Sequence, residues 1–177
     1  LACTHTHTGP GTRVPSAKGN ARHWEKVNLA DIPVIEGSNR RIVEGCAKAA
    51  AEALSDLSPA TMLMGRGEAK GISFIRRYRM KDGTVRTNPN YCKERIVRPC
   101  AEPDQALPLF FFEDTQGKPL GSIASFALHH DIISGTQISS DYSGVVARRM
   151  KERFGMDFVS LFFAGFCGNI NHANYMG

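Results

Sequence analysis

The sequence lacks several features that would place it in a specialised class of protein. Its longest apolar runs are short, such as 109–112 and 161–164, whereas a membrane-spanning helix needs about 18 or more apolar residues. The first residues show neither the basic region nor the apolar region of a secretory signal. The net charge of +5 is scattered and forms no block of like charges. This pattern favours a solvated surface over a nucleic-acid groove, so we expect no nucleic-acid partner.

The sequence also contains no C-x-x-C pair. The five cysteines are an odd number. Cys92 and Cys100 could pair across a loop, and the sequence alone does not establish that pairing. The 177 residues are 42% hydrophobic and 22% charged, which is typical of one globular domain. Because the chain begins without Met, we expect it to be a piece of a longer protein.

Hydrophobic periodicity predicts two helices and a series of strands. After an irregular segment over 12–36, apolar spacing predicts a helix over 38–57 with Ser38 as its N-cap. A second helix is expected from Ser140 or Asp141 to Phe154, ended by Gly155. The expected strands cover 1–8, 60–65 (buried), 73–80, 85–87, 109–113, 120–128 and 157–163, and 88–108 is expected to be mostly loop. Turns at Asp82-Gly83 and Gln116-Gly117 are expected to join the strands on either side of them. Strands that alternate with helices predict an α/β fold, a layered mixed sheet with flanking helices, in one domain over 1–177.

Four of the six histidines lie in two tight groups, each at the predicted end of a strand. The first group is His5 and His7, which would share one face of a strand because residues two apart point the same way. The second is His129 and His130, followed by Asp131, which could be a ligand or an acceptor beside one. Imidazoles at two strand ends favour a zinc site. Each group alone is equally typical of polar residues at a strand terminus.

Two further segments are candidates for function. The terminal loop from Phe163 to His172 follows a predicted strand, and its small residues allow a ligand to approach the backbone. An ordinary glycine-rich turn is the alternative. The pair Arg76-Arg77 could bind an oxyanion or a carboxylate, although a surface charge pair is the more common explanation of such a dipeptide.

These motifs, taken in order, resemble the neutral/alkaline (non-lysosomal) ceramidase family in its N-terminal catalytic domain. The segment 4–11, T-H-T-H-T-G-P-G, is similar to the family's T-H-T-H-S-G-P-G. The remaining matches are weaker singly but follow in family order: Arg76 with Asn88-Pro89 resembles N-R…N-P, 126–129 resembles F-A-T-H, 139–144 resembles S-S-D-x-x-G, and 163–171 resembles the region that ends in G-D-V-S-P-N.

The resemblance implies a zinc-dependent amidase, a hydrolase that splits the N-acyl bond of ceramide into sphingosine and fatty acid. It implies His5 and His129 as zinc ligands, His7 as a group that assists proton transfer beside a metal-activated water, and Arg76 as a polar support. The family's other ligands, a Glu and a Tyr, lie downstream of this stretch. The chain is thus expected to be a partial ceramidase-like domain that acts on a lipid-like N-acyl substrate in sphingolipid metabolism. Secretion or another extracytoplasmic location, with contact to a membrane surface, is implied in the same way.

Three departures from the family pattern concern the substrate. Asn171 stands at the position of the family's serine and is grouped with His7 and Arg76 as a catalytic residue, Asn169 stands at its aspartate, and His130 at a proline. A nucleophilic water on a metal is unaffected by the loss of the serine. The chain is therefore expected to be a divergent member. The alternatives are a zinc hydrolase of a different amide or ester and a non-catalytic binding domain of the same fold.

Overall fold

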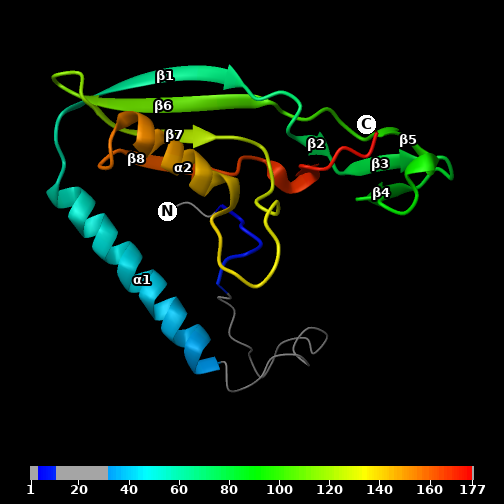
Figure 1. The fold of residues 1–177 in the computed structure, drawn as a ribbon, viewed down its shortest axis with the longest axis horizontal. Helices are drawn as coiled ribbons and strands as arrows, with labels where there is room; N and C mark the ends of the chain where they lie inside the picture. The colour runs from blue at the N-terminus through cyan, green and yellow to red at the C-terminus, as the bar shows by residue number, and fades with distance from the viewer. Residues whose placement is uncertain (1–3, 11–31, 177) are drawn as a thin grey trace. The chain divides into compact units, whose positions relative to one another are not determined.

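The computed structural model describes residues 4–10 and 32–176, which divide between two compact units (Figure 1). One unit includes residues 9–58 and contains helix α1 (Ile32–Ser55), and the other includes residues 2–8 and 59–177 and contains all the strands. The predictions made for 1–3 and 11–31 lie outside the described residues. None of the helices in the described part combines the length and the apolarity that a membrane crossing requires.

Helix α1 confirms the first predicted helix but begins earlier. It starts at Ile32 rather than at Ser38, so Ser38 is an interior residue and not the N-cap. Pro33 therefore lies in the first turn, where a proline removes no intrahelical hydrogen bond because those N–H groups have no helical partner. The apolar stripe of the helix stays exposed within its own unit, with Ile42 at 41% and Leu54 at 70% exposure.

The second unit is built on a four-stranded mixed sheet. Its order is β1 (Ala60–Glu68), β6 (Ala106–Asp114), β7 (Pro119–Ser125) and β8 (Val159–Phe163). The first two pairings are antiparallel and the last is parallel. The turn between β6 and β7 confirms the predicted hairpin: Gly117 has a φ of 80°, and Asp114 Oδ1 accepts the N–H of Gln116 at 2.8 Å.

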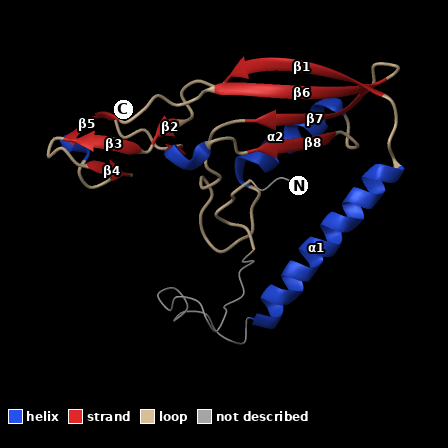
Figure 2. Ribbon diagram, turned by 180° about the vertical axis from the view of Figure 1, so that it is seen from behind, coloured by secondary structure: helices blue, strands red, loops and turns tan. Residues whose placement is uncertain are grey.

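Helix α2 (Asp141–Phe154) connects β7 to β8 and lies against one face of this sheet (Figure 2). The rings of Phe154 and Phe158 lie 5.1 and 5.6 Å from that of Phe111 on β6. The predicted helix is confirmed to the residue at its C-terminal end, where Gly155 adopts a φ of 106°. Val146 of α2 packs against a core made of Ile75, Phe126, Ala127, Leu128, Phe162 and Ile170. The predicted α/β class is thus confirmed.

Two small sheets extend the second unit. Strand β2 (Phe74–Ile75) pairs with β9 (Ile170–Asn171), and β3 (Arg77–Met80) lies between β4 (Val85–Thr87) and β5 (Ile96–Pro99). Single 3-10 turns, η3 (Lys93–Arg95) and η4 (Cys167–Asn169), precede β5 and β9. The β3–β4 hairpin at Asp82-Gly83 was predicted. Strand β5 was not, since it lies inside a proline-rich stretch that was expected to be loop.

One other expectation is wrong. The strand at 60–65 was expected to be buried, but all nine residues of β1 are exposed. The reason is its position: β1 forms one edge of the sheet, whereas α2 packs on β8 at the other edge. The disulfide that the sequence left open does not form, because Cys92 and Cys100 are both free thiols.

Candidate metal centre

Three imidazoles meet at one point of the second unit. The rings of His5, His7 and His129 make mutual edge-to-face contacts, with centroids 5.1 to 5.6 Å apart. One ring nitrogen from each lies within 4.8 Å of the other two. Among the described residues, this is the one group of three or more metal-ligating side chains that the structure brings together. The structure thus brings together both members of the first histidine group of the sequence and one member of the second.

Backbone and hydroxyl bonds hold the first histidine pair in place. The N–H of His7 donates to the carbonyl of His130 at 2.9 Å. The hydroxyls of Thr6 and Thr8 both donate to the carbonyl of Ser139, at 3.0 and 3.2 Å, and the N–H of Ser139 donates back to Thr8. Threonines and histidines alternate along this segment and have different roles. Thr6 and Thr8 anchor the segment, and His5 and His7 contribute their imidazoles to the site.

The predicted strand in this segment is wrong for its described part. Residues 4–6 have no regular structure, and a turn begins at His7. His5 has a φ of 58°, in the left-handed region that an L side chain adopts only at a cost. Such a residue cannot continue an extended strand. The two imidazoles meet because the backbone bends at His5, and the alternation of a strand does not explain their convergence.

His129 is buried at 3% exposure and is fixed by one bond. Its Nδ1 lies 2.8 Å from the carbonyl of Ile170. Because a carbonyl only accepts, Nδ1 carries the hydrogen and Nε2 keeps its lone pair. Burial lowers the pKa of His129, and the charge of Arg76 lowers this pKa further, while the bond to Ile170 and the Asp131 carboxylate act in the opposite direction. A neutral imidazole with a free Nε2 is the form that binds metals.

His130 points away from this centre into the core. It is completely buried and stacks on the ring of Tyr142 at 4.1 Å, with Phe162 at its edge. Neither ring nitrogen has a hydrogen-bond partner among the described residues. Burial lowers the pKa of His130, with Asp141 acting in the opposite direction. His130 thus serves the site through its backbone carbonyl, which accepts from His7.

The start of α2 supports the wall behind His130. Tyr142 donates its hydroxyl hydrogen to the carbonyl of Leu128 at 2.8 Å. Asp141, buried and with a φ of 56°, accepts from the N–H of Ile133 at 2.9 Å. The predicted capping is only half right, because Ser140 is the N-cap residue but its side chain makes no capping bond. Together these contacts fix the loop that follows His129.

Arg76 is a structural clamp on the terminal loop. Its Nε and Nη2 both donate to the carbonyl of Gly168, at 3.1 and 2.7 Å, and its N–H donates to the carbonyl of Asn169. Its own carbonyl accepts from the N–H of Asn88 at 2.8 Å. The spatial link of Arg76 to Asn88 agrees with their pairing in the sequence motif. The guanidinium is close enough to His129 for its charge to act on that imidazole.

Asn171 belongs to a second polar cluster, beside the three imidazoles. It is buried, its Oδ1 accepts from the N–H of His172 at 2.6 Å, and its Nδ2 lies 3.5 Å from Asp131 Oδ2. Asp131 Oδ1 lies 3.1 Å from His172 Nδ1. Asp131 is thus not among the three grouped ligands. His172 was not identified as a functional residue from the sequence. Nothing in the sequence around Asn171 indicates that the carboxylate of Asp131 lies close to it.

The residues of the three-histidine group fit a zinc ion. Imidazole is a preferred zinc ligand, and a catalytic zinc takes three protein ligands. With Zn–N bonds of about 2.1 Å, tetrahedral ligand atoms are roughly 3.4 Å apart, so nitrogens up to 4.8 Å apart must close by a modest amount. His5 and His7 are exposed, whereas His129 is buried and already oriented by Ile170.

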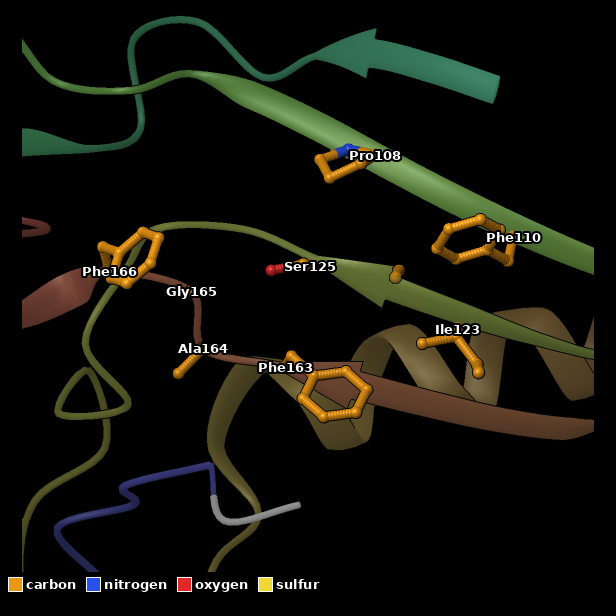
Figure 3. Close-up of a pocket in the computed structure, with 9 residues that line it drawn as sticks. Pro108, Phe110, Ile123, Ser125, Phe163, Ala164, Gly165 and Phe166 are labelled. Carbon is orange, nitrogen blue, oxygen red and sulfur yellow. The ribbon is translucent and has the colours of Figure 1, made fainter. Parts of the chain in front are cut away.

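Two apolar cavities flank the sheet, and neither is lined by the imidazoles. One, of about 480 Å³, lies beside α2 and includes Leu128, Tyr142 and Phe162. The other, of about 640 Å³, opens on the far face. Figure 3 shows Phe110, Ile123 and Phe163 turned toward it, with Phe166 at its end. Phe166 is 99% exposed and follows Gly165, whose φ of 59° turns the chain out of β8.

Comparison with solved structures identifies the fold. The structure is similar to that of a neutral ceramidase from Pseudomonas aeruginosa, with a TM-score of 0.65 and 23% identity over 97% of this chain. A second structure, described as a ceramidase complexed with C2, gives a TM-score of 0.62 at the same identity and coverage. The chain spans about a quarter of the length of both proteins. No protein-family model and no curated protein matches the sequence. The comparison establishes a ceramidase-like α/β fold.

Proposed function

We propose that this chain is part of a zinc-dependent hydrolase that cleaves an N-acyl amide bond, with ceramide or a ceramide-like lipid as substrate. The observation that carries the proposal is the convergence of His5, His7 and His129 on one point, with every segment anchored. The ceramidase-like fold supports the same function. Sphingolipid metabolism and a secreted or other extracytoplasmic location, at a membrane surface, are part of the proposal.

His5 and His129 would hold the zinc ion. When bound, zinc polarises a carbonyl oxygen and lowers the pKa of a coordinated water. His7 lies within the same 4.8 Å and is exposed, so it can take a proton from a nucleophilic water and release it to solvent. The N–H of His7 is tied to His130, which keeps the imidazole at this distance while the proton moves. A third ligand role for His7 is the alternative that the geometry offers.

Arg76 and Asn171 would position polar groups around the reaction. Arg76 holds the carbonyls of Gly168 and Asn169 and so fixes the loop that leads to Ile170, the acceptor of His129. Its positive charge also favours negative charge that develops on a substrate oxygen near His129. Asn171 has both ends of its amide engaged. It is therefore a support for its neighbours and not a nucleophile.

Asn169 and Asn171 are the reason to consider a second candidate function. This function is that of a zinc hydrolase with the same fold that acts on a different amide or on an ester. Asparagines stand where the resembling family has Asp and Ser, and Asn169 Oδ1 is buried without a partner among the described residues. A panel of N-acyl sphingosines, N-acyl amino acids, acylated amino sugars and simple esters separates the candidates. Ceramide as the fastest substrate by a wide margin supports the first, and preference for another acyl compound supports the second.

The test of the metal centre is zinc stoichiometry by elemental analysis on the intact natural protein. We expect about one zinc per chain, lost in His5→Ala and in His129→Ala and kept in the control His172→Gln. The variant His7→Ala decides its role: zinc kept with activity lost marks a proton carrier, and zinc lost marks a third ligand. A folded wild-type protein without zinc would overturn the proposal and favour a non-catalytic binding domain.

A further inference from the structure

Asp131 and His172, which lie beside Asn171, form a polar pair that the proposed reaction has not used. Asp131 accepts from His172 Nδ1 at 3.1 Å, and Asn171 accepts from the N–H of His172 at 2.6 Å. The side chain of His172 is 38% exposed and that of Asp131 18%. No group in 4–10 or 32–176 hydrogen-bonds His172 Nε2. One imidazole nitrogen is therefore held, and the other is open to solvent or substrate.

The carboxylate sets the tautomer of His172. Because a carboxylate oxygen accepts, Nδ1 of His172 carries its hydrogen toward Asp131, and Nε2 is the atom that gains or loses a proton. This is the arrangement that acid–base histidines use in hydrolases, where the carboxylate orients the imidazole and fixes its tautomer.

The cluster lies beside the three imidazoles. The segments 129–131 and 170–172 are joined by two successive links: His129 Nδ1 to the carbonyl of Ile170, and Asp131 to the side chains of Asn171 and His172. Burial lowers the pKa of His129, and the charge of Asp131 acts against this effect. The carboxylate of Asp131 is therefore within electrostatic reach of the metal-binding group. His172 is thus at the solvent-exposed rim of the proposed site.

We propose that His172, oriented by Asp131, is the general acid that protonates the leaving amine. This inference rests on the proposed amide hydrolysis. His172, protonated from solvent, gives its Nε2 proton to the amide nitrogen as the C–N bond breaks, and the bonding electron pair stays on that nitrogen. The water oxygen bonds to the carbonyl carbon, and the proton it loses passes to His7 and then to solvent. One amide and one water become one carboxylic acid and one amine.

The experiment compares two leaving groups on the same acyl chain in the zinc-loaded natural protein. One substrate is an N-alkyl amide, whose amine must be protonated to leave, and the other is a 4-nitrophenyl ester, whose phenolate leaves without a proton. In His172→Gln we expect kcat for the amide to fall at least 100-fold, the usual contribution of general acid catalysis. For the ester we expect a change of less than about 3-fold. Zinc content and the thermal midpoint should stay unchanged because His172 is partly exposed.

Asp131 would act through His172 and is a positioning residue. Asp131→Asn should reduce amide turnover alone and should have little further effect in the His172→Gln background. An equal loss on both substrates, or no loss on the amide, would overturn the general-acid role and leave the proposed function standing. A zinc-loaded wild type that cleaves the ester but no amide would overturn the proposed amidase function itself.

Discussion

The start of α2 offers a sharp test of the packing behind the site. A Cβ added at Gly144 would overlap Ser140 Oγ and lie 2.9 Å from Ser140 Cβ, closer than side chains tolerate. Ser140 has no capping bond to lose, so its side chain can be shortened without another penalty. The pair 140 and 144 therefore allows the clash to be switched off by a second substitution.

Two opposing effects determine how much Gly144→Ala changes the free energy of unfolding. An alanine at a helical position is worth about 1 kcal/mol more than glycine when nothing obstructs it. Overpacking costs about 1–3 kcal/mol. We expect Gly144→Ala to lower the free energy of unfolding by up to about 2 kcal/mol in the presence of Ser140. In a Ser140→Gly background, the same change should raise it by about 1 kcal/mol. Ser140→Ala, which keeps Cβ and removes Oγ, should give an intermediate value.

Urea unfolding followed by far-ultraviolet circular dichroism measures this cycle. The four proteins should share one m-value, so that shifts in midpoint report stability alone. A coupling energy of about 1–3 kcal/mol is expected between the two positions. If Gly144→Ala stabilises the protein to the same extent whether residue 140 is serine or glycine, the two positions do not touch and the described helix start is wrong.

Three further predictions concern the residues around the imidazoles. Gly165→Ala should cost about 1–2 kcal/mol in unfolding free energy because of its positive φ and its approach to the backbone of 126–127, whereas Gly168→Ala, with open space around it, should cost clearly less. Tyr142→Phe should cost about 1 kcal/mol, measured by urea unfolding, because the carbonyl of Leu128 loses its donor. Burial lowers the pKa of His130, so the unfolded chain binds a proton first as pH falls below about 6.5. The metal-free protein should then lose up to about 1.4 kcal/mol of stability per pH unit, and a pH series on His130→Phe should show a shallower loss.

Local chemistry made much of the fold predictable. Asp-Gly at 82–83 and the turn at Gly117 indicated the two hairpins, and both formed because those residues supply the required turn geometry. Gly155 marked the end of α2 for the same reason. Elements that depend on distant partners were missed. Strand β5 forms because Tyr78 pairs with Pro99, and the β2–β9 pair joins residues almost a hundred positions apart.

In the candidate site, too, features set by the local sequence were predictable and those that depend on distant partners were not. Histidine groups at two places in the sequence predicted that His5, His7 and His129 would meet. The cause was different from the one expected, since a bend at His5 and the carbonyl of His130 bring them together. The partner of His172 is Asp131, 41 positions away. No local pattern encodes this contact, because it depends on the long-range bond between His129 Nδ1 and the carbonyl of Ile170, which brings the two segments together.

The threonine anchors also determine when the site can form. Thr6 is 133 positions from the carbonyl that receives its hydroxyl. At about 5–20 residues per second of synthesis, roughly 7–27 s separate the appearance of His5 and His7 from that of their anchor on the ribosome. During this interval the imidazole pair is unanchored, and contacts of such long sequence separation close late in folding. Assembly of the three imidazoles is therefore a late event, and a metal ion that arrives early meets only the local His-x-His pair.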